Sequence, residues 1–319
     1  MPRSPLNRTL QLSPEERTRY ASELLRIEDL RNGKFDAPYS HTMQSAARSI
    51  GSERNDGAEE GIGPEAFLEK IICAPLEAAA PLLPAGFADL IVCDPPYNLS
   101  KDFNGLKFRQ MSEGAYEGYI ESWLPEVIRL LAPHGSLYIC GDWKCTAALQ
   151  RSLSKHLTIM NRITWRREKG RGATRNWKNS MEDIWFAVRD PKHYTFNLED
   201  VKVRHKVIAP YRKDGLAKDW QEDGEGKFRM TCPSNFWDDT VVPFWSMPEN
   251  TDHPTQKPES LMERIILASS DKGDVVFDPF LGSGTTAIVA KRLGRRWAAV
   301  EINEEYCCLA AKRLTCTSH

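Results

Sequence analysis

The sequence lacks the features that would place it in a membrane or an export pathway, or give it a metal site. Apolar runs such as residues 90–93 are far too short to cross a bilayer. The amino terminus, Met1-Pro2-Arg3-Ser4, has no apolar signal core, so we expect a cytoplasmic protein. Its eight cysteines include no Cys-x-x-Cys pair, which argues against a zinc site and a disulfide framework. Reduced, mostly buried thiols and no metal are the prediction.

The chain also lacks a net charge that would by itself favour an anionic partner. Its 319 residues carry 43 Lys and Arg against 44 Asp and Glu, a formal net charge of −1. The cations are nevertheless clustered, once between residues 162 and 178, where Glu168 is the single acid, and again between residues 202 and 218. Basic stretches on a neutral chain predict a surface directed at an anionic partner.

Composition and periodicity divide the chain into four parts. Residues 1–62 form a polar leader and linker, in which the capping box Ser13-Pro14-Glu15-Glu16 predicts a helix running towards Asn32-Gly33. Residues 63–190 and 252–319 alternate short apolar runs with helical periodicity, which predicts an α/β fold with a mostly parallel sheet and helices on its faces. Residues 191–251 lack clear periodicity and predict a loop-rich insert rather than more sheet. The expected strands are 71–73, 90–93, 136–140, 158–165, 183–188, 275–277 and 297–300, and the expected helices include 116–131 and 261–269.

The first chemical signal is an apolar strand that runs directly into Asp94-Pro95-Pro96-Tyr97. Prolines fix φ and offer carbonyls without N–H groups, so this loop holds hydrogen-bond acceptors rigidly at the carboxyl end of a strand. Such acceptors suit the exocyclic amino group of a base, whose protons would bond to the Asp94 carboxylate and the Pro95 carbonyl, leaving the nitrogen lone pair free to attack. Tyr97 would stack on a base taken out of a duplex. Alone, the tetrapeptide fits an Asp-capped turn equally well.

The second signal, residues 275–286, joins a strand to a helix through the glycine turn Gly282-Ser283-Gly284. Glycines let the backbone approach a ligand closely at the edge where open α/β sheets bind cofactors. The next strand ends in Glu301, which is placed to accept hydrogen bonds from ribose hydroxyls. The last glycine of Gly-x-Gly-x-x-Gly is missing, as is the Gly-Lys-Ser/Thr of triphosphate loops, so we do not expect a phosphate cradle.

The third signal is His253-Pro254-Thr255-Gln256-Lys257-Pro258, which alone fits the start of a helix. Together the three segments resemble the amino-methyltransferases of DNA. Their order, with the catalytic tetrapeptide first, a variable region next and the cofactor loop last, resembles the circularly permuted β class, which includes many modification methylases of restriction systems. The resemblance covers roughly residues 71–190 and 252–314.

This resemblance implies a Rossmann-like sheet that binds S-adenosyl-L-methionine, with a target-recognition region inserted at residues 191–251. It implies that Phe280 and the glycine turn line the methionine moiety, that Glu301 binds the ribose, and that residues 255–257 complete the pocket near the cofactor carboxylate. Family members usually have an acidic residue upstream, against the cofactor adenine, where this chain reads Cys73-Ala74-Pro75. The implied catalytic residues are Asp94, Pro95, Pro96 and Tyr97, and the implied cofactor-binding residues are His253, Thr255, Gln256, Lys257, Asp278, Phe280, Gly282, Ser283, Gly284, Thr285 and Glu301.

The implied reaction is methylation of adenine N6 in duplex DNA, because the Ser form of the tetrapeptide is the more usual one for cytosine. Cytosine-N4 methylation by the same machinery stays open. A catalytically silent DNA-binding subunit is disfavoured by the intact motifs, and a nicotinamide-dependent dehydrogenase by the glycine pattern. A homodimer and a cognate restriction endonuclease are further partners that the resemblance leaves open.

The basic stretch around residues 166–178 combines cations and glycines with Trp177, a composition suited to holding DNA phosphates. Trp177 would either stack on a base or pack inside the protein. Reading of guanine edges is expected from the insert. The expected DNA contacts are Arg166, Arg167, Lys169, Arg171, Arg175, Trp177, Lys178, Arg204, Arg212 and Lys213.

Overall fold

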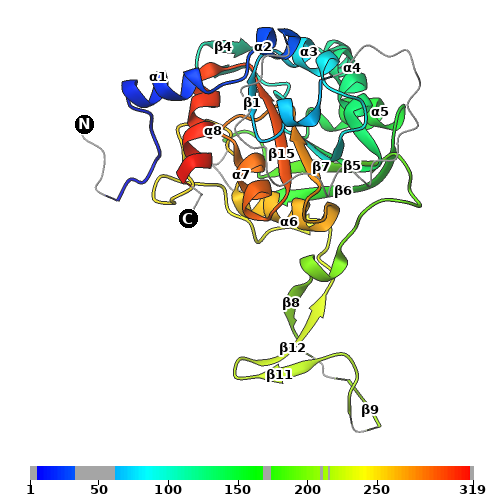
Figure 1. Ribbon diagram of the computed structural model, residues 1–319. Helices are drawn as coiled ribbons and strands as arrows, with labels where there is room; N and C mark the ends of the chain where they lie inside the picture. The colour runs from blue at the N-terminus through cyan, green and yellow to red at the C-terminus, as the bar shows by residue number, and fades with distance from the viewer. Residues whose placement is uncertain (1–5, 33–61, 168–173, 209–210, 215, 317–319) are drawn as a thin grey trace.

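A central sheet organises the computed structural model, which describes residues 6–32, 62–167, 174–208, 211–214 and 216–316 (Figure 1). The sheet has eight strands in the order β1-β15-β14-β2-β5-β7-β6-β13. The seven strands predicted from the sequence are all present. The strand bounds are β1 Ile71–Cys73, β2 Ala88–Cys93, β5 Leu131–Gly141, β6 Thr158–Arg166, β7 Met181–Val188, β13 Phe236–Trp237, β14 Val275–Asp278 and β15 Arg296–Glu301.

The direction of the strands decides where the chemistry gathers. Strands β1, β15, β14, β2 and β5 are parallel, so their carboxyl ends share one edge of the sheet. Strand β7 is antiparallel to both β5 and β6, so β7 begins and β6 ends at that same edge. In open α/β sheets this is the edge at which ligands bind.

Helices cover both faces of the sheet, as predicted, because successive side chains of a central strand point to opposite faces. In β2, Ile91 and Cys93 belong to a core shared with α4 and α5, whereas Leu90 and Val92 belong to a core shared with α6, α7 and α8. The helix bounds are α3 Leu76–Ala79, α4 Glu113–Leu130, α5 Thr146–Ser154, α6 Glu259–Ser269, α7 Thr285–Arg292 and α8 Glu304–Cys316, with short 3₁₀ turns η2 Pro64–Ala66, η3 Ala80–Leu82 and η4 Leu198–Val201.

The described part of the leader, residues 6–32, forms two helices where the sequence predicted one. The capping box is confirmed at the start of α1 Pro14–Ser22, but a second helix, α2 Ile27–Asn32, follows after a break. The break has a cause in the sheet. The Leu25 N–H donates to Ile71 O at 3.0 Å and Leu25 O accepts from Cys73 N at 2.9 Å, so this residue pairs with the edge of β1 and cannot be helical.

The insert is loop-rich, as predicted, but the expectation that it adds no sheet was wrong. It forms a three-stranded antiparallel sheet of β8 Val203–Lys206, β11 Gln221–Asp223 and β12 Gly226–Thr231, a hairpin of β9 Arg212–Lys213 and β10 Leu216–Ala217, and β13, which joins the central sheet. Figure 1 shows β8, β9, β11 and β12 as an arm that projects from the body. Strands β8, β9, β10 and β11 have only two to four residues, too few to show an apolar alternation, whereas the alternation of Phe228 and Met230 in β12 is a signal that sequence reasoning missed.

A second unpredicted hairpin, β3 Lys101–Phe103 with β4 Leu106–Phe108, follows the catalytic tetrapeptide. The cysteines are free thiols and most are buried, as expected. Within the described residues, the structure contains no helix with the length and apolar character needed to span a membrane.

Candidate active site

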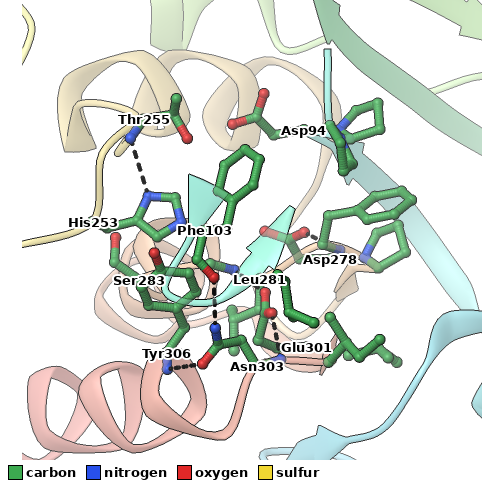
Figure 2. A pocket seen from close by; sticks show the side chains of 18 of the residues that line it. Asp94, Phe103, His253, Thr255, Asp278, Leu281, Ser283, Glu301, Asn303 and Tyr306 are labelled. Atoms are coloured by element: carbon green, nitrogen blue, oxygen red, sulfur yellow. Dashed lines mark hydrogen bonds between the residues drawn. The ribbon is translucent and has the colours of Figure 1, made fainter. Parts of the chain in front are cut away.

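A pocket of about 410 Å³ opens at the carboxyl edge of the sheet. Four segments distant in sequence line it: residues 94–97 after β2, 253–257 before α6, 278–283 after β14, and Glu301 at the end of β15. They meet because β14 lies between β2 and β15 in a parallel sheet. Figure 2 shows Asp94, His253, Asp278 and Glu301 around this single cavity, with Phe103 of the β3–β4 hairpin across it.

The Asp94–Tyr97 loop is held from both ends. The Tyr97 hydroxyl lies 3.0 Å from Asp94 Oδ1, and the Tyr116 hydroxyl of α4 donates to Pro96 O at 3.0 Å. Just beyond the loop, the Asn98 N–H donates to Cys145 Sγ at 3.2 Å. Burial raises the pKa of Tyr97 well above its usual value, and the neighbouring Asp94 charge raises it further, so Tyr97 keeps its proton.

Lys257 is buried to 6% side-chain exposure, and its ammonium faces the catalytic loop. The Nζ atom lies 2.6 Å from Asp94 Oδ2 and 3.1 Å from the Tyr97 hydroxyl. Burial lowers the pKa of Lys257, but the charges of Asp94 and Glu182 outweigh it, so the pKa lies above its usual value. Sequence reasoning placed this side chain near the cofactor carboxylate. In the structure it pairs with Asp94, since a buried ammonium requires a carboxylate partner.

Glu301 holds the glycine turn as well as facing the pocket. Its Oε2 accepts from the Gly282 N–H at 2.8 Å, and its Oε1 accepts from the Asn303 N–H at 2.8 Å. Burial raises the pKa of Glu301, and these backbone donors partly offset the increase. Gly282 has φ +54, and a Cβ at this position would lie 3.1 Å from His253 Nε2, so the glycine keeps the cavity open there.

Gly284 does not line the pocket. It has φ +86, and a Cβ would lie only 2.7 Å from the Ala310 Cβ, so this glycine serves the close packing of the α7 start against α8. The other ten predicted cofactor residues do line the cavity, although several side chains are engaged within the protein. Gln256 Oε1 accepts from Thr251, and Thr285 Oγ1 donates to Lys257 O at 3.1 Å.

Asp278 ends β14 beside the catalytic loop. Its Oδ1 accepts from the Phe280 N–H at 3.0 Å, which shapes the turn. Burial raises the pKa of Asp278 to about 7, against the opposing effect of the hydrogen bonds it accepts. The segment after β1, where the chain departs from the usual acidic residue, also reaches the cavity through Ala74, Pro75 and Glu77.

Sequence reasoning missed Glu182, which stands 3% exposed beside the catalytic loop. Its Oε2 lies 3.0 Å from the Tyr97 hydroxyl and 3.5 Å from Lys257 Nζ. The predicted strand begins one residue later, at Asp183, and so leaves Glu182 out. The sequence signal that could have identified Glu182 is a pair of acidic residues directly before the apolar run of residues 184–188. The hairpin residue Phe103 was missed too, as were Asn303 and Tyr306, which follow β15 in the lining.

The structure places the predicted DNA contacts in different surroundings. Arg167 lines the pocket and pairs with Glu182 at 2.7 Å. Trp177 is 93% exposed, so the alternative that it packs inside the protein is wrong for this structure. Arg204 pairs with Asp223 at 2.6 and 2.8 Å on the arm. Arg166, Arg175, Arg212 and Lys213 are exposed and Lys178 is half-buried, whereas Lys169 and Arg171 lie outside the described residues.

The fold and the site together define a DNA methylase: an open α/β sheet carries an Asp-Pro-Pro-Tyr loop and a glycine turn at one pocket. A family model described as DNA methylase matches residues 88–312. The chain is 37% identical to the type II methyltransferase M.HpaI of Haemophilus parainfluenzae, over 77% of this chain and 74% of the relative. It is 38% identical to the DNA adenine methyltransferase YhdJ of Escherichia coli K12, over 74% of this chain and 79% of the relative. The chain therefore belongs to the N6/N4 DNA methylase family.

Solved structures support the fold. The PvuII DNA methyltransferase, described as cytosine-N4-specific, matches with a TM-score of 0.58 and 17% identity, over 76% of this chain and 85% of that one. A putative DNA modification methylase from Thermus thermophilus, complexed with S-adenosyl-L-methionine, matches with a TM-score of 0.54 and 22% identity, over 77% of this chain and 93% of that one. At these identities the likeness concerns the fold: an eight-stranded, mostly parallel sheet flanked by helices.

Proposed function

We propose that this DNA methylase transfers a methyl group from S-adenosyl-L-methionine to N6 of adenine in duplex DNA. The observation that carries the proposal is the meeting of the Asp94–Tyr97 loop and the Gly282–Glu301 pair in one cavity. A target amino group and a methyl donor can react only when they are held side by side.

The residues of the cavity fit the donor. Glu301 spends one lone pair of each oxygen on a backbone N–H, which leaves acceptor capacity for two ribose hydroxyls. Gly282 leaves a recess beside His253 that a Cβ would fill. Phe280, Ser283 and the aromatic rings of Phe103 and Tyr306 line the rest of this half of the pocket. When bound, the cofactor supplies an already activated methyl group.

The catalytic loop acts on the target base. The Asp94 carboxylate and the Pro95 carbonyl accept the two amino protons, which favours a nitrogen whose lone pair is free to attack. Tyr97 stacks on the extruded base, and its ring is fixed through its hydroxyl. Hydrogen bonds to Tyr97 and Lys257 position the Asp94 carboxylate before the base arrives, and such preorganisation lowers the reaction barrier.

Adenine is favoured over cytosine by the Asp form of the tetrapeptide and by the 38% identity to a DNA adenine methyltransferase. Cytosine N4 is the second candidate, because a cytosine-N4-specific enzyme shares the fold. The test is nucleoside analysis of DNA from a methylation-deficient host that expresses the protein. N6-methyladenine is expected, and N4-methylcytosine in its place would contradict the adenine assignment.

The parts of the chain follow from this role. Residues 63–190 and 252–319 are the catalytic and cofactor halves of one methyltransferase domain in circularly permuted order. Residues 191–251 are the target-recognition insert, which the projecting arm supports because it extends beyond the body (Figure 1). Residues 1–62 are an amino-terminal extension, whose helix α1 bonds to α8 through Arg17 and Glu305 at 2.6 Å. Duplex DNA is the proposed substrate. We further propose that the protein is cytoplasmic, forms a homodimer and has a cognate restriction endonuclease as its partner.

A further inference from the structure

Glu182 is a buried carboxylate with no role in the reaction as described so far. It stands 3% exposed at the carboxyl edge of the sheet, because β7 runs antiparallel to β5 and begins where the parallel strands end. Its Oε1 pairs with Arg167 Nη1 at 2.7 Å. Its Oε2 lies 3.0 Å from the Tyr97 hydroxyl and 3.5 Å from Lys257 Nζ.

Lys257 therefore lies between two carboxylates at unequal distances. Its Nζ is 2.6 Å from Asp94 Oδ2 and 3.5 Å from Glu182 Oε2. The Tyr97 hydroxyl lies 3.0 Å from the other Asp94 oxygen. Each Asp94 oxygen thus already accepts from one donor of the protein itself, and the Lys257 ammonium bonds to the carboxylate that the proposed function assigns to the target amino group.

A buried ammonium that leaves one carboxylate must find another, since an unpaired buried charge is strongly unfavourable. Among the described side chains, Glu182 is the second carboxylate paired with Lys257. The four groups Asp94, Glu182, Lys257 and Arg167 carry two charges of each sign, so a small movement of Lys257 from one acid to the other keeps the cluster neutral.

We propose that Glu182 is a positioning residue that takes over the Lys257 ammonium when the target amino group bonds to Asp94. Asp94 thereby loses its hydrogen bond to the ammonium and can bond to the target amino group, and no buried cation is left unpaired. This inference rests on the proposed function, since it needs an amino group that arrives at Asp94. It adds a step, the transfer of Lys257 between two acids, that binding of cofactor and DNA alone does not require.

The experiment measures single-turnover methyl transfer from labelled S-adenosyl-L-methionine to plasmid DNA from a methylation-deficient host. Glu182→Gln keeps the size of the side chain and an acceptor for the Tyr97 hydroxyl but removes the charge that attracts Lys257. We expect the transfer rate to fall about tenfold or more, within the range of coupled neighbours, while the Kd for cofactor and for DNA stays within about threefold. Glu182→Asp, the matched control that keeps the charge, should recover most of the rate.

A double-mutant cycle with Lys257→Met tests the coupling itself. Without the ammonium there is nothing to transfer, so Glu182→Gln should change the rate of the Lys257→Met protein by less than about threefold. Equal losses in both backgrounds would overturn the inference, as would equal losses in the Asp and Gln variants or full activity of Glu182→Gln. No methylation by the unaltered protein would instead contradict the proposed function, so the two failures are distinguishable.

Discussion

The carboxylate of Glu301 offers the sharpest test of the cofactor half of the pocket. It accepts the Gly282 N–H and the Asn303 N–H, each at 2.8 Å, through different oxygens. Glutamine retains one acceptor oxygen and turns an NH₂ group towards the other N–H. One hydrogen bond to a charged acceptor is thereby lost, which costs about 1.5–3 kcal/mol. Burial raises the pKa of Glu301, so removing its charge returns part of the desolvation cost, and we expect the lower end of that range.

Glu301→Gln should therefore have two separate effects. In urea, the free energy of unfolding should fall by about 1.5–2 kcal/mol, because the glycine turn loses a hydrogen bond. In calorimetry, the Kd for S-adenosyl-L-methionine should rise about 10- to 150-fold, because an amide cannot accept from both ribose hydroxyls. Glu304→Gln is the matched control. Glu304 begins α8 and forms a largely exposed ion pair with Arg26, so this substitution should change neither the free energy of unfolding nor the cofactor Kd appreciably. A cofactor Kd for Glu301→Gln within about threefold of the unaltered protein would refute the ribose role.

Three further predictions follow from the packing and the charges. Gly284→Ala should lower the free energy of unfolding by about 2–5 kcal/mol, because the alanine would have a φ of +86 and a Cβ 2.7 Å from the Ala310 Cβ. Adding Ala310→Gly should restore the part of the loss that is due to this overlap. Urea unfolding that shows no restoration would contradict the prediction. Burial raises the pKa of Asp278 to about 7, whereas the pKa of this group in the unfolded chain is about 4. The protonated group therefore stabilises the fold fully below about pH 4, and this contribution is lost as the pH rises through about 7. The free energy of unfolding of Asp278→Asn, relative to the unaltered protein, should accordingly increase by roughly 2–3 kcal/mol between pH 5 and 7, and a pH-independent difference would be evidence against the raised pKa. Arg175 is exposed, and Arg175→Ala should weaken DNA binding and reduce the slope of log K against log salt concentration by about one. If filter binding gives an unchanged slope, Arg175 does not contact a DNA phosphate.

The inner strands of the central sheet could be predicted because they are buried on both faces and read as apolar runs. Residues 90–93 and 297–300 are examples in which the sequence alone locates the strand within a residue or two. The glycine turn and the tetrapeptide could be predicted for a related reason, since only particular residues permit those backbone shapes. Their meeting at one edge then follows from the parallel order of β2, β14 and β15.

The remaining features depend on tertiary contacts that no local pattern encodes. The leader helix breaks at Leu25 because that residue pairs with β1. Most arm strands have only two to four residues, so their sequence is too short to carry an alternation. Lys257 could be placed in the pocket from its motif, but its partner Asp94 lies 163 positions away in the sequence, and only the fold decides which acid it pairs with.

The central claim is that Asp94 acts on the target amino group and not on the cofactor. Asp94→Ala removes the acceptor, while Lys257 keeps Glu182 within 3.5 Å. The direct measurement compares, in one preparation, the Kd for S-adenosyl-L-methionine and the single-turnover rate of methyl transfer to duplex DNA. The account predicts a cofactor Kd within about threefold of the unaltered protein and a transfer rate reduced at least about 100-fold. Full transfer activity in Asp94→Ala would contradict it.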